Sequence, residues 1–385
     1  MASTGCRLAI DSNYLPTLDG WRALAILGVM ICHSCDAFFH AEGPYPNAAL
    51  HAVTRHGALG VDVFFGISGF LICTRLIEEH KKNGCISLKR FYIRRAFRIL
   101  PPYFTYLAVL GLLTAAGLIY VAPTVWWSCL LFFRNYLPVS QAGRFYTGHC
   151  WSLAIEEHFY LLWPTLLVLW GIGRARRWVL VLAGAIACWR VVEFRHQWLG
   201  QWLPGVGFFP RTDIRLDGLL WGCWAALMLA SPTWRAAWQR RLSPGIWIGL
   251  VGAFVACVYY QPPLGMVWQA MLIPILLVGT VLRPETLVGR FLESGPMQWI
   301  GRLSYSLYLW NSLFFPVMDN PRPLPLGRLQ ELPWSIVPVF ACAALSYYLV
   351  ERPMIRLGHI VAARVGKNDQ VSARPELPIP AREAA

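Results

Sequence analysis

Long apolar stretches recur along the chain, and short polar segments separate them. A helix needs roughly 20 mostly apolar residues to cross the hydrocarbon core of a bilayer. Ten stretches approach this length, and we expect each of them to form a membrane-spanning helix. The predicted spans are about 21–39, 57–77, 99–121, 150–171, 177–193, 213–230, 245–260, 266–283, 303–318 and 333–350. The pattern therefore predicts an all-α fold, a polytopic membrane helix bundle of about ten transmembrane spans.

Basic residues between the apolar stretches predict the orientation. Residues 78–98 contain seven Lys and Arg, and basic loops remain in the cytoplasm. The next basic cluster, at 174–177, falls on the same side if the short apolar segment 124–137 lies at the outer interface without crossing. Both termini are then expected in the cytoplasm. We expect residues 1–350 to form the membrane domain and 351–385 a cytoplasmic tail with a disordered end.

Composition supports a membrane protein. Hydrophobic residues make up 56% of the chain and charged residues only 14%, whereas soluble domains carry about 25% charged residues. This balance excludes a disordered chain, a soluble enzyme and a typical nucleic-acid binder. The net charge of +14 fits cytoplasmic loops that contact anionic membrane lipids. The Cys32 and Cys35 pair has no second ligand pair nearby, so we expect no metal site.

Two ionisable residues, Arg22 and His33, lie in the first predicted span. Their spacing amounts to three helical turns plus roughly 20°, which puts both side chains on one face, about 16 Å apart along the axis. Ionisable groups in a span usually face a cavity or a partner. Arg22 fits a cytoplasmic anchor or a channel residue. His33 fits a structural histidine or a group lining the same channel.

The second span brings Asp62 and Ser68 into the bundle. Asp62 lies near the outer end, where it fits either a helix-end cap or a carboxylate that orients His33. Ser68, with its neighbouring glycines, allows close helix approach and adds a hydroxyl.

The start of the fourth span places five polar or aromatic residues on one face, at His149, Ser152, Glu156, Tyr160 and Trp163. Two adjacent glutamates deep in a span fit a catalytic site or a buried ion pair. Arg190, Arg211 or Arg215 are possible partners for such a pair.

Two further groups suggest ligand contacts. Arg95 and Arg98 are an i, i+3 pair that could hold phosphate or anionic lipid. Ser304, Tyr308 and Asn311 share a face of the ninth span and fit either a substrate contact or interhelical hydrogen bonds.

Six of these segments occur in an order that resembles the acyltransferase 3 family of integral-membrane O-acyltransferases. They are LDGWRALAILGVMICHS (18–34), GVDVFFGISGFLI (60–72), RRAFRILPPYF (94–104), HCWSLAIEEHFYLLWP (149–164), GRLSYSLYLWN (301–311) and ERP (351–353). The resemblance covers roughly 18–356. Each segment alone is weakly specific, but the ordered set is strong.

The resemblance implies transfer of an acyl group, acetyl by default, from cytoplasmic acyl-CoA to a hydroxyl of a glycan or glycolipid, with no permanently bound cofactor. It implies a bacterial inner-membrane location. Arg22 and His33 match the family's Arg-ten-residues-His motif, and Arg95 and Arg98 match its cytoplasmic Arg-x-x-Arg. Asn311 stands where the family often has His.

On this basis we expect His33 to be the general base, with Asp62 or Glu156 orienting it. A transient acyl-histidine is the open alternative for the route. Donor or acceptor contacts are expected from the remaining polar candidates, which are Arg22, Arg95, Arg98, Ser68, Ser152, Arg211 and Asn311. The rival function is a secondary transporter that uses the intramembrane His, Glu and Arg as a substrate or proton path.

Overall fold

The computed structural model describes residues 14–42, 56–138, 144–260, 262, 264–315 and 325–372. Helices make up the secondary structure of these residues, and none of them forms a strand, which confirms the all-α prediction. The longer helices are α1 (Pro16–Glu42), α3 (Gly60–Asn83), α4 (Leu88–Ala115), α7 (Cys150–His196), α9 (Asp217–Leu229), α11 (Pro244–Tyr260), α12 (Gly265–Leu282), α14 (Gly295–Phe314), α15 (Ile336–Ser346) and α16 (Arg352–Ser372).

Short helices connect them. These are α5 (Pro123–Leu130), η2 (Arg134–Tyr136), α6 (Arg144–Thr147), η3 (Gly200–Trp202), α8 (Thr212–Arg215), α10 (Pro232–Arg241), α13 (Leu287–Leu292), η4 (Gly327–Gln330) and the π-helical turn η5 (Tyr347–Glu351).

Three of the described helices, α3, α4 and α12, are long and apolar enough to cross a membrane. A fourth candidate combines Thr212–Leu229 with α10, although the two parts are bent by 106°. The helix α11 is apolar but has only 17 residues. The number of ten spans and the orientation of the termini therefore stay predictions.

Two predicted spans, 150–171 and 177–193, form one continuous helical run, α7. The run is broken at Gly171, whose φ of 70° and ψ of 154° are not helical. A positive φ is readily adopted by glycine because it lacks a Cβ atom. The helix break thus falls at the boundary between the two predicted spans.

The apolar segment 124–137 forms only α5, with eight residues, and η2, with three. Eight helical residues extend roughly 12 Å, well short of the hydrocarbon thickness. This length agrees with the prediction that the segment does not cross.

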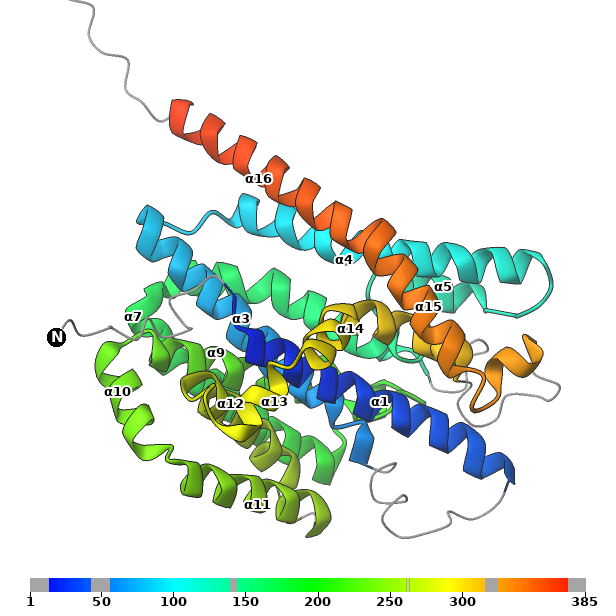
Figure 1. Ribbon diagram of the computed structural model, residues 1–385, viewed down its shortest axis with the longest axis horizontal. Coiled ribbons are helices and arrows are strands. Elements are labelled where there is room, and N and C mark those ends of the chain that lie inside the picture. The colour runs from blue at the N-terminus through cyan, green and yellow to red at the C-terminus, as the bar shows by residue number, and fades with distance from the viewer. Residues whose placement is uncertain are drawn as a thin grey trace, which may run out of the picture.

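Close glycine contacts hold the central helices together. A side chain at Gly69 of α3 would overlap the backbone of Leu219 in α9, and one at Gly301 of α14 would overlap that of Asp19 in α1. Small residues allow such close approach of helix backbones. Helices α1, α3, α9 and α14 consequently form a tight group at the centre of the bundle (Figure 1).

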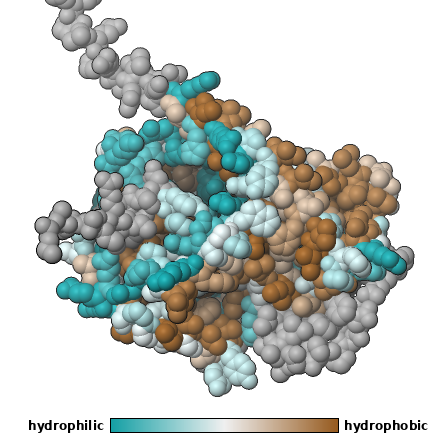
Figure 2. Space-filling view, in the orientation of Figure 1, coloured by the Kyte–Doolittle hydropathy of each residue, from teal (hydrophilic) through white to brown (hydrophobic). Residues whose placement is uncertain are grey.

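The helix α16 crosses the surface of the bundle and packs along α4 (Figure 1). Residues 352–372 of the predicted cytoplasmic tail are therefore helical, and residues 373–385, with the predicted disordered end, lie outside the described residues. Figure 2 shows hydrophilic residues gathered around a hollow beneath α16, whereas the opposite half of this face is mostly hydrophobic.

Candidate active site

A cavity of about 890 Å³ runs into the bundle between α1, α3, α4, α7 and α14, and its mouth is bordered by η5 and α16. Along α3 its lining extends from Val61 to Asn83, a distance of roughly 33 Å at 1.5 Å per residue. The cavity is therefore long and narrow. Its charged lining consists of the basic residues Arg22, Arg75, Lys82, Arg90, Arg94, Arg95, Arg98 and Arg302 and the acidic residues Asp19, Glu78, Glu79, Glu156, Glu157 and Glu351.

Most of the basic residues lie in the last part of α3 and the first part of α4. We call this part of the cavity the basic mouth, and it consists of Arg75, Lys82, Arg90, Arg94, Arg95 and Arg98. Two of them are already paired, since Glu79 accepts from both Arg90 and Arg94 at 2.9 Å. Arg75 forms a more exposed pair with Glu78 at 3.2 Å. Lys82 and Arg98 form no ion pair with a carboxylate of the described chain.

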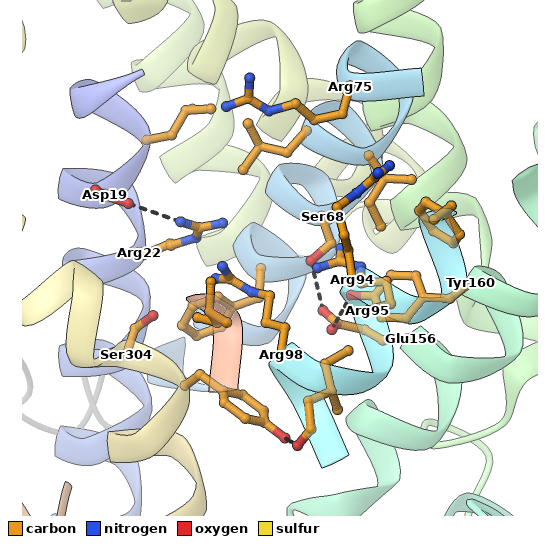
Figure 3. Close-up of a pocket in the computed structure, with 18 of the residues that line it drawn as sticks. Asp19, Arg22, Ser68, Arg75, Arg94, Arg95, Arg98, Glu156, Tyr160 and Ser304 are labelled. Atoms are coloured by element: carbon orange, nitrogen blue, oxygen red, sulfur yellow. Dashed lines mark hydrogen bonds and ion pairs between the residues drawn. The ribbon is translucent and has the colours of Figure 1, made fainter. Parts of the chain in front are cut away.

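The predicted basic residues Arg22, Arg95 and Arg98 all line this cavity (Figure 3). Arg22 donates to Asp19 at 2.9 Å. The Arg95 guanidinium lies 4.2 Å from the centre of the Tyr160 ring, within cation–π range. Three separate helix faces predicted from spacing thus meet in one space.

Glu156 lies in the middle of the cavity and holds two hydroxyls. Ser68 donates to its Oε1 at 2.9 Å, and Tyr160 donates to its Oε2 at 2.6 Å (Figure 3). These charge-assisted hydrogen bonds link α3 to α7 and account for one of the two adjacent glutamates. The arginines considered as possible partners, Arg190, Arg211 and Arg215, pair with other carboxylates instead.

The cavity ends at Ser152 and Tyr308, whose hydroxyl oxygens are 2.5 Å apart. The Tyr308 hydroxyl also donates to the backbone carbonyl of His149 at 2.9 Å. The Ser152 hydroxyl lies 3.3 Å from the same carbonyl, and each hydroxyl has a single proton, so either of the two can donate to the other. This closed chain of hydrogen bonds forms the deep end of the cavity.

His33 lies beyond that deep end, and its Nδ1 is 2.7 Å from Asn311 Oδ1. The Asn311 amide nitrogen donates to the carbonyls of Leu307 and Tyr308, at 3.2 and 2.5 Å, so the amide oxygen faces His33. An amide oxygen only accepts, so Nδ1 of His33 carries the proton and the lone pair of the neutral ring is on Nε2. Asn311 is therefore placed to position His33.

Arg22 and His33 are not in the same described space. Arg22 lines the cavity, whereas His33 and Asn311 are absent from the lining in the described part of the chain. Asn311 follows Tyr308 by three residues on α14, which corresponds to about 4.5 Å along the axis. The separation between the cavity and His33 is thus about one side-chain layer.

His149 is a second histidine at this layer, and the sequence alone indicated no role for it. It is buried, and its Nδ1 has no hydrogen-bond partner among the residues that the structure describes. Its ring packs edge-on against Tyr106 and Tyr308, with centroids 5.5 and 5.4 Å away. Its place on the helical face shared with Ser152 and Glu156 is the sequence feature that could have indicated its position near the cavity.

Asp62 does not orient His33, so that expectation is wrong. Its carboxylate accepts from Arg215 at 2.7 Å, and Arg215 also lies 5.7 Å from the ring centre of Trp151. A guanidinium is a stronger partner for a carboxylate than a neutral imidazole, because it always carries a charge.

Arg211 also lies outside the cavity lining. Its guanidinium is 2% exposed and donates to Glu193 at 2.6 Å and to Asp213 at 2.5 Å. With all its charge neutralised inside the bundle, Arg211 is placed to hold α7 and α8 together.

Comparison with known proteins decides the family. The family model described as an acyltransferase domain matches residues 15–350. The chain belongs to the acyltransferase 3 family. The match covers α1, α3, α4, α7 and α14, which form most of the cavity wall, and ends just before Glu351.

Curated relatives of this acyltransferase agree with the assignment. It is 29% identical to the peptidoglycan O-acetyltransferase OatA of Listeria monocytogenes, over 90% of this chain and 57% of the relative. It is also 29% identical to a putative peptidoglycan O-acetyltransferase of Bacillus subtilis, over 89% of this chain and 55% of the relative. A putative O-acetyltransferase of Staphylococcus aureus is 27% identical, over 90% and 58%. The chain thus spans little more than half the length of these relatives. No solved structure matches it significantly.

Proposed function

We propose that this chain is a membrane O-acyltransferase that moves an acetyl group from cytoplasmic acetyl-CoA to a hydroxyl of a glycan at the outer face of the bacterial inner membrane. One observation carries the proposal. The imidazole of His33, whose Nδ1 lies 2.7 Å from Asn311 Oδ1, lies beyond the closed end of a cavity that has a basic mouth.

The shape and charge of the cavity favour an acyl-CoA donor. Such a donor has a polyanionic nucleotide end and a long, thin arm that carries the thioester. Arg95 and Arg98 of the basic mouth are suited to bind the phosphates, because guanidinium groups bind phosphate bidentately. The arm then passes Arg22 and Glu156 toward Tyr308.

His33 is assigned the role of general base. Its Nε2 removes the proton of the acceptor hydroxyl while the hydroxyl oxygen attacks the thioester carbonyl. The carbon–sulfur bond then breaks, and the imidazolium returns the proton to the departing CoA sulfur. The products are an acyl ester and free CoA thiol, and the histidine is regenerated.

The acceptor is assigned from two observations. The named relatives are peptidoglycan O-acetyltransferases, which favours a sugar hydroxyl of a cell-envelope glycan. His33 also lies in the C-terminal half of α1, whereas Arg22, which lines the cavity, lies in the N-terminal half. If the basic mouth faces the cytoplasm, the acceptor reaches His33 from the outer side.

The Ser152–Tyr308 pair closes the cavity and has to separate before a thioester can meet His33. A single hydrogen bond contributes about 1 kcal/mol net, so thermal motion opens it readily.

The test is acetyl transfer by the purified protein in liposomes, with acetyl-CoA and a peptidoglycan fragment. The variant His33→Ala is expected to lose transfer about a hundredfold or more, as expected for loss of a general base. His196→Ala is the matched control, because His196 is an exposed residue at the far end of α7. Near-normal turnover by His33→Ala would exclude His33 as the base. Glycan-dependent release of CoA thiol distinguishes the enzyme from a transporter, which would move a substrate and leave the thioester intact.

A further inference from the structure

One face of the C-terminal helix continues the wall of the donor cavity beyond the region matched by the family model. Glu351, Ile355 and His359 follow one another at intervals of four residues, and all three line the cavity. Residues four apart lie on the same helical face. The matched region ends at 350, so this stripe lies just beyond it.

The stripe is held at both ends. Glu351 is 1% exposed and accepts a hydrogen bond from Ser306 of α14 at 2.9 Å. At the other end Gly358 lies so close to α4 that an added Cβ would come within 2.6 Å of Phe97 Cβ. The helix α16 is therefore docked on the bundle at the position that brings His359 to the basic mouth.

The groups that face His359 are mostly cationic. Arg94 and Arg98 come from α4, Arg75 comes from α3, and all three line the same cavity. Partial burial, followed by repulsion from Arg94, Arg98 and Arg75, lowers the pKa of His359. Glu78 and Glu79 are occupied by Arg75, Arg90 and Arg94, and Glu351 is bonded to Ser306. The histidine is thus mostly neutral at pH 7 in the empty cavity, and a bound polyanion would favour its charged form.

We propose that His359 binds a phosphate group of the acyl-CoA donor and takes up a proton as the donor binds. This inference rests on the proposed function, because it presumes a CoA donor in the cavity. A phosphate dianion among Arg94, Arg98 and His359 would convert the repulsion at this site into attraction. The ring remains exposed enough to contact a ligand.

An anionic lipid headgroup presents the same phosphate chemistry. The donor is favoured because His359 lines the cavity that leads inward to Glu156 and Tyr308, whereas a lipid needs only the outer surface of α16. The exposed Arg356 lies on α16 but outside the described cavity lining. It provides the matched control for charge near the membrane surface.

The experiment is calorimetric titration of the full chain in neutral detergent with coenzyme A. It is run near pH 6 and near pH 8, in two buffers of different ionisation enthalpy. His359→Gln keeps hydrogen bonding but cannot be charged, and Arg356→Gln removes a charge from the same helix. For His359→Gln we expect about fivefold to tenfold weaker CoA binding near pH 6, less than about twofold near pH 8, and less proton uptake on binding. Arg356→Gln should bind CoA within about twofold of the unmodified chain at both pH values.

Three outcomes would overturn the inference. The first is equal CoA affinity and equal proton uptake for His359→Gln and the unmodified chain. The second is a larger loss for Arg356→Gln, since that would indicate a general surface field. The third is weaker binding of short-chain phosphatidylglycerol to His359→Gln while CoA binding to this variant stays unchanged, which would assign the site to lipid. If the unmodified chain itself fails to bind CoA, the proposed donor is wrong, and this result is distinct from the three above.

Discussion

Tyr308 and Ser152 join α14 to α7 through hydroxyl oxygens that are 2.5 Å apart. The pair closes the cavity on the side of His33. A wall made of side-chain hydroxyls can open without moving a helix. It therefore offers a way to keep water and thioester from His33 until an acceptor arrives.

Removal of the Tyr308 hydroxyl should uncouple the reaction. In Tyr308→Phe the ring remains, but Ser152 and the His149 carbonyl lose the Tyr308 hydroxyl and keep only their mutual contact at 3.3 Å, which weakens the closure by about 1–3 kcal/mol. We expect acetyl-CoA hydrolysis without acceptor to rise several-fold, measured as thiol release. Tyr305→Phe is the control, because Tyr305 also lines the cavity but donates to the Ile99 carbonyl. Unchanged hydrolysis in Tyr308→Phe would show that the pair is not a barrier.

Asn311 should affect turnover more than donor binding. Asn311→Ala removes the hydrogen bond that holds Nδ1 of His33, so we expect kcat for transfer to fall about tenfold or more, with the KM for acetyl-CoA within about twofold. Asn311→His supplies a ring nitrogen at the same position and should retain more activity than Asn311→Ala. An increase in the KM with unchanged kcat would instead place Asn311 in donor binding.

Glu156 should be sensitive to loss of its charge even when its shape is kept. In Glu156→Gln the amide nitrogen would face Ser68 or Tyr160, both of which donate to the carboxylate. Loss of one charge-assisted hydrogen bond costs about 1.5–3 kcal/mol, so the melting temperature in detergent should fall. Ser68→Ala removes only one of the two donors, so its melting temperature should fall less. An equal melting temperature for Glu156→Gln and the unmodified chain would contradict this account.

The Asp62–Arg215 pair should be structural. Asp62→Asn leaves a partly buried guanidinium without its carboxylate, so we expect a loss of about 1–3 kcal/mol, below the roughly 3–5 kcal/mol of a fully buried pair. The double variant Asp62→Asn/Arg215→Met should recover much of the loss in thermal or denaturant unfolding. Glu78→Gln, at the more exposed Arg75 pair, should change stability by less than about 1 kcal/mol. If Asp62→Asn is as stable as the unmodified chain, the pair does not hold α3 to α8.

The pH dependence of stability should report on His359. Its pKa is lowered in the folded chain from the ordinary value of 6.5, so near and just below that pH the unfolded chain binds more protons than the folded one. The contribution of His359 to stability is therefore retained above 6.5 and lost as the pH falls below it. Comparison of the unmodified chain with His359→Gln between about pH 7.5 and pH 5.5 should show the steeper loss in the unmodified chain. Parallel curves would refute the assignment.

The sequence predicted the local features of the site because each depends on helical spacing. The pairing of Ser152 with Glu156 on one face, and of Arg95 with Arg98, needs only the period of 3.6 residues. Both pairs line the cavity. The end of the first half of α7 near residue 171 was likewise visible as an interruption between apolar stretches.

What the sequence did not reveal depends on which helices meet. Asp62 was expected beside His33 because both were placed near the outer side, but α8 brings Arg215 to Asp62 and α14 brings Asn311 to His33. The role of α16 was missed because its cavity-facing stripe is set by the contact of Gly358 with Phe97. No period within residues 351–372 indicates which neighbour that stripe will face.

The amide of Asn311 restricts how a catalytic cycle can run. One edge of the His33 ring is held by a side chain that is itself anchored to two carbonyls of its own helix. Only Nε2 can then accept and return a proton, so in the proposed reaction the incoming alcohol and the departing thiol must contact this same atom in turn. In the proposed reaction, donor and acceptor enter from opposite ends of the molecule and must both reach this one nitrogen atom.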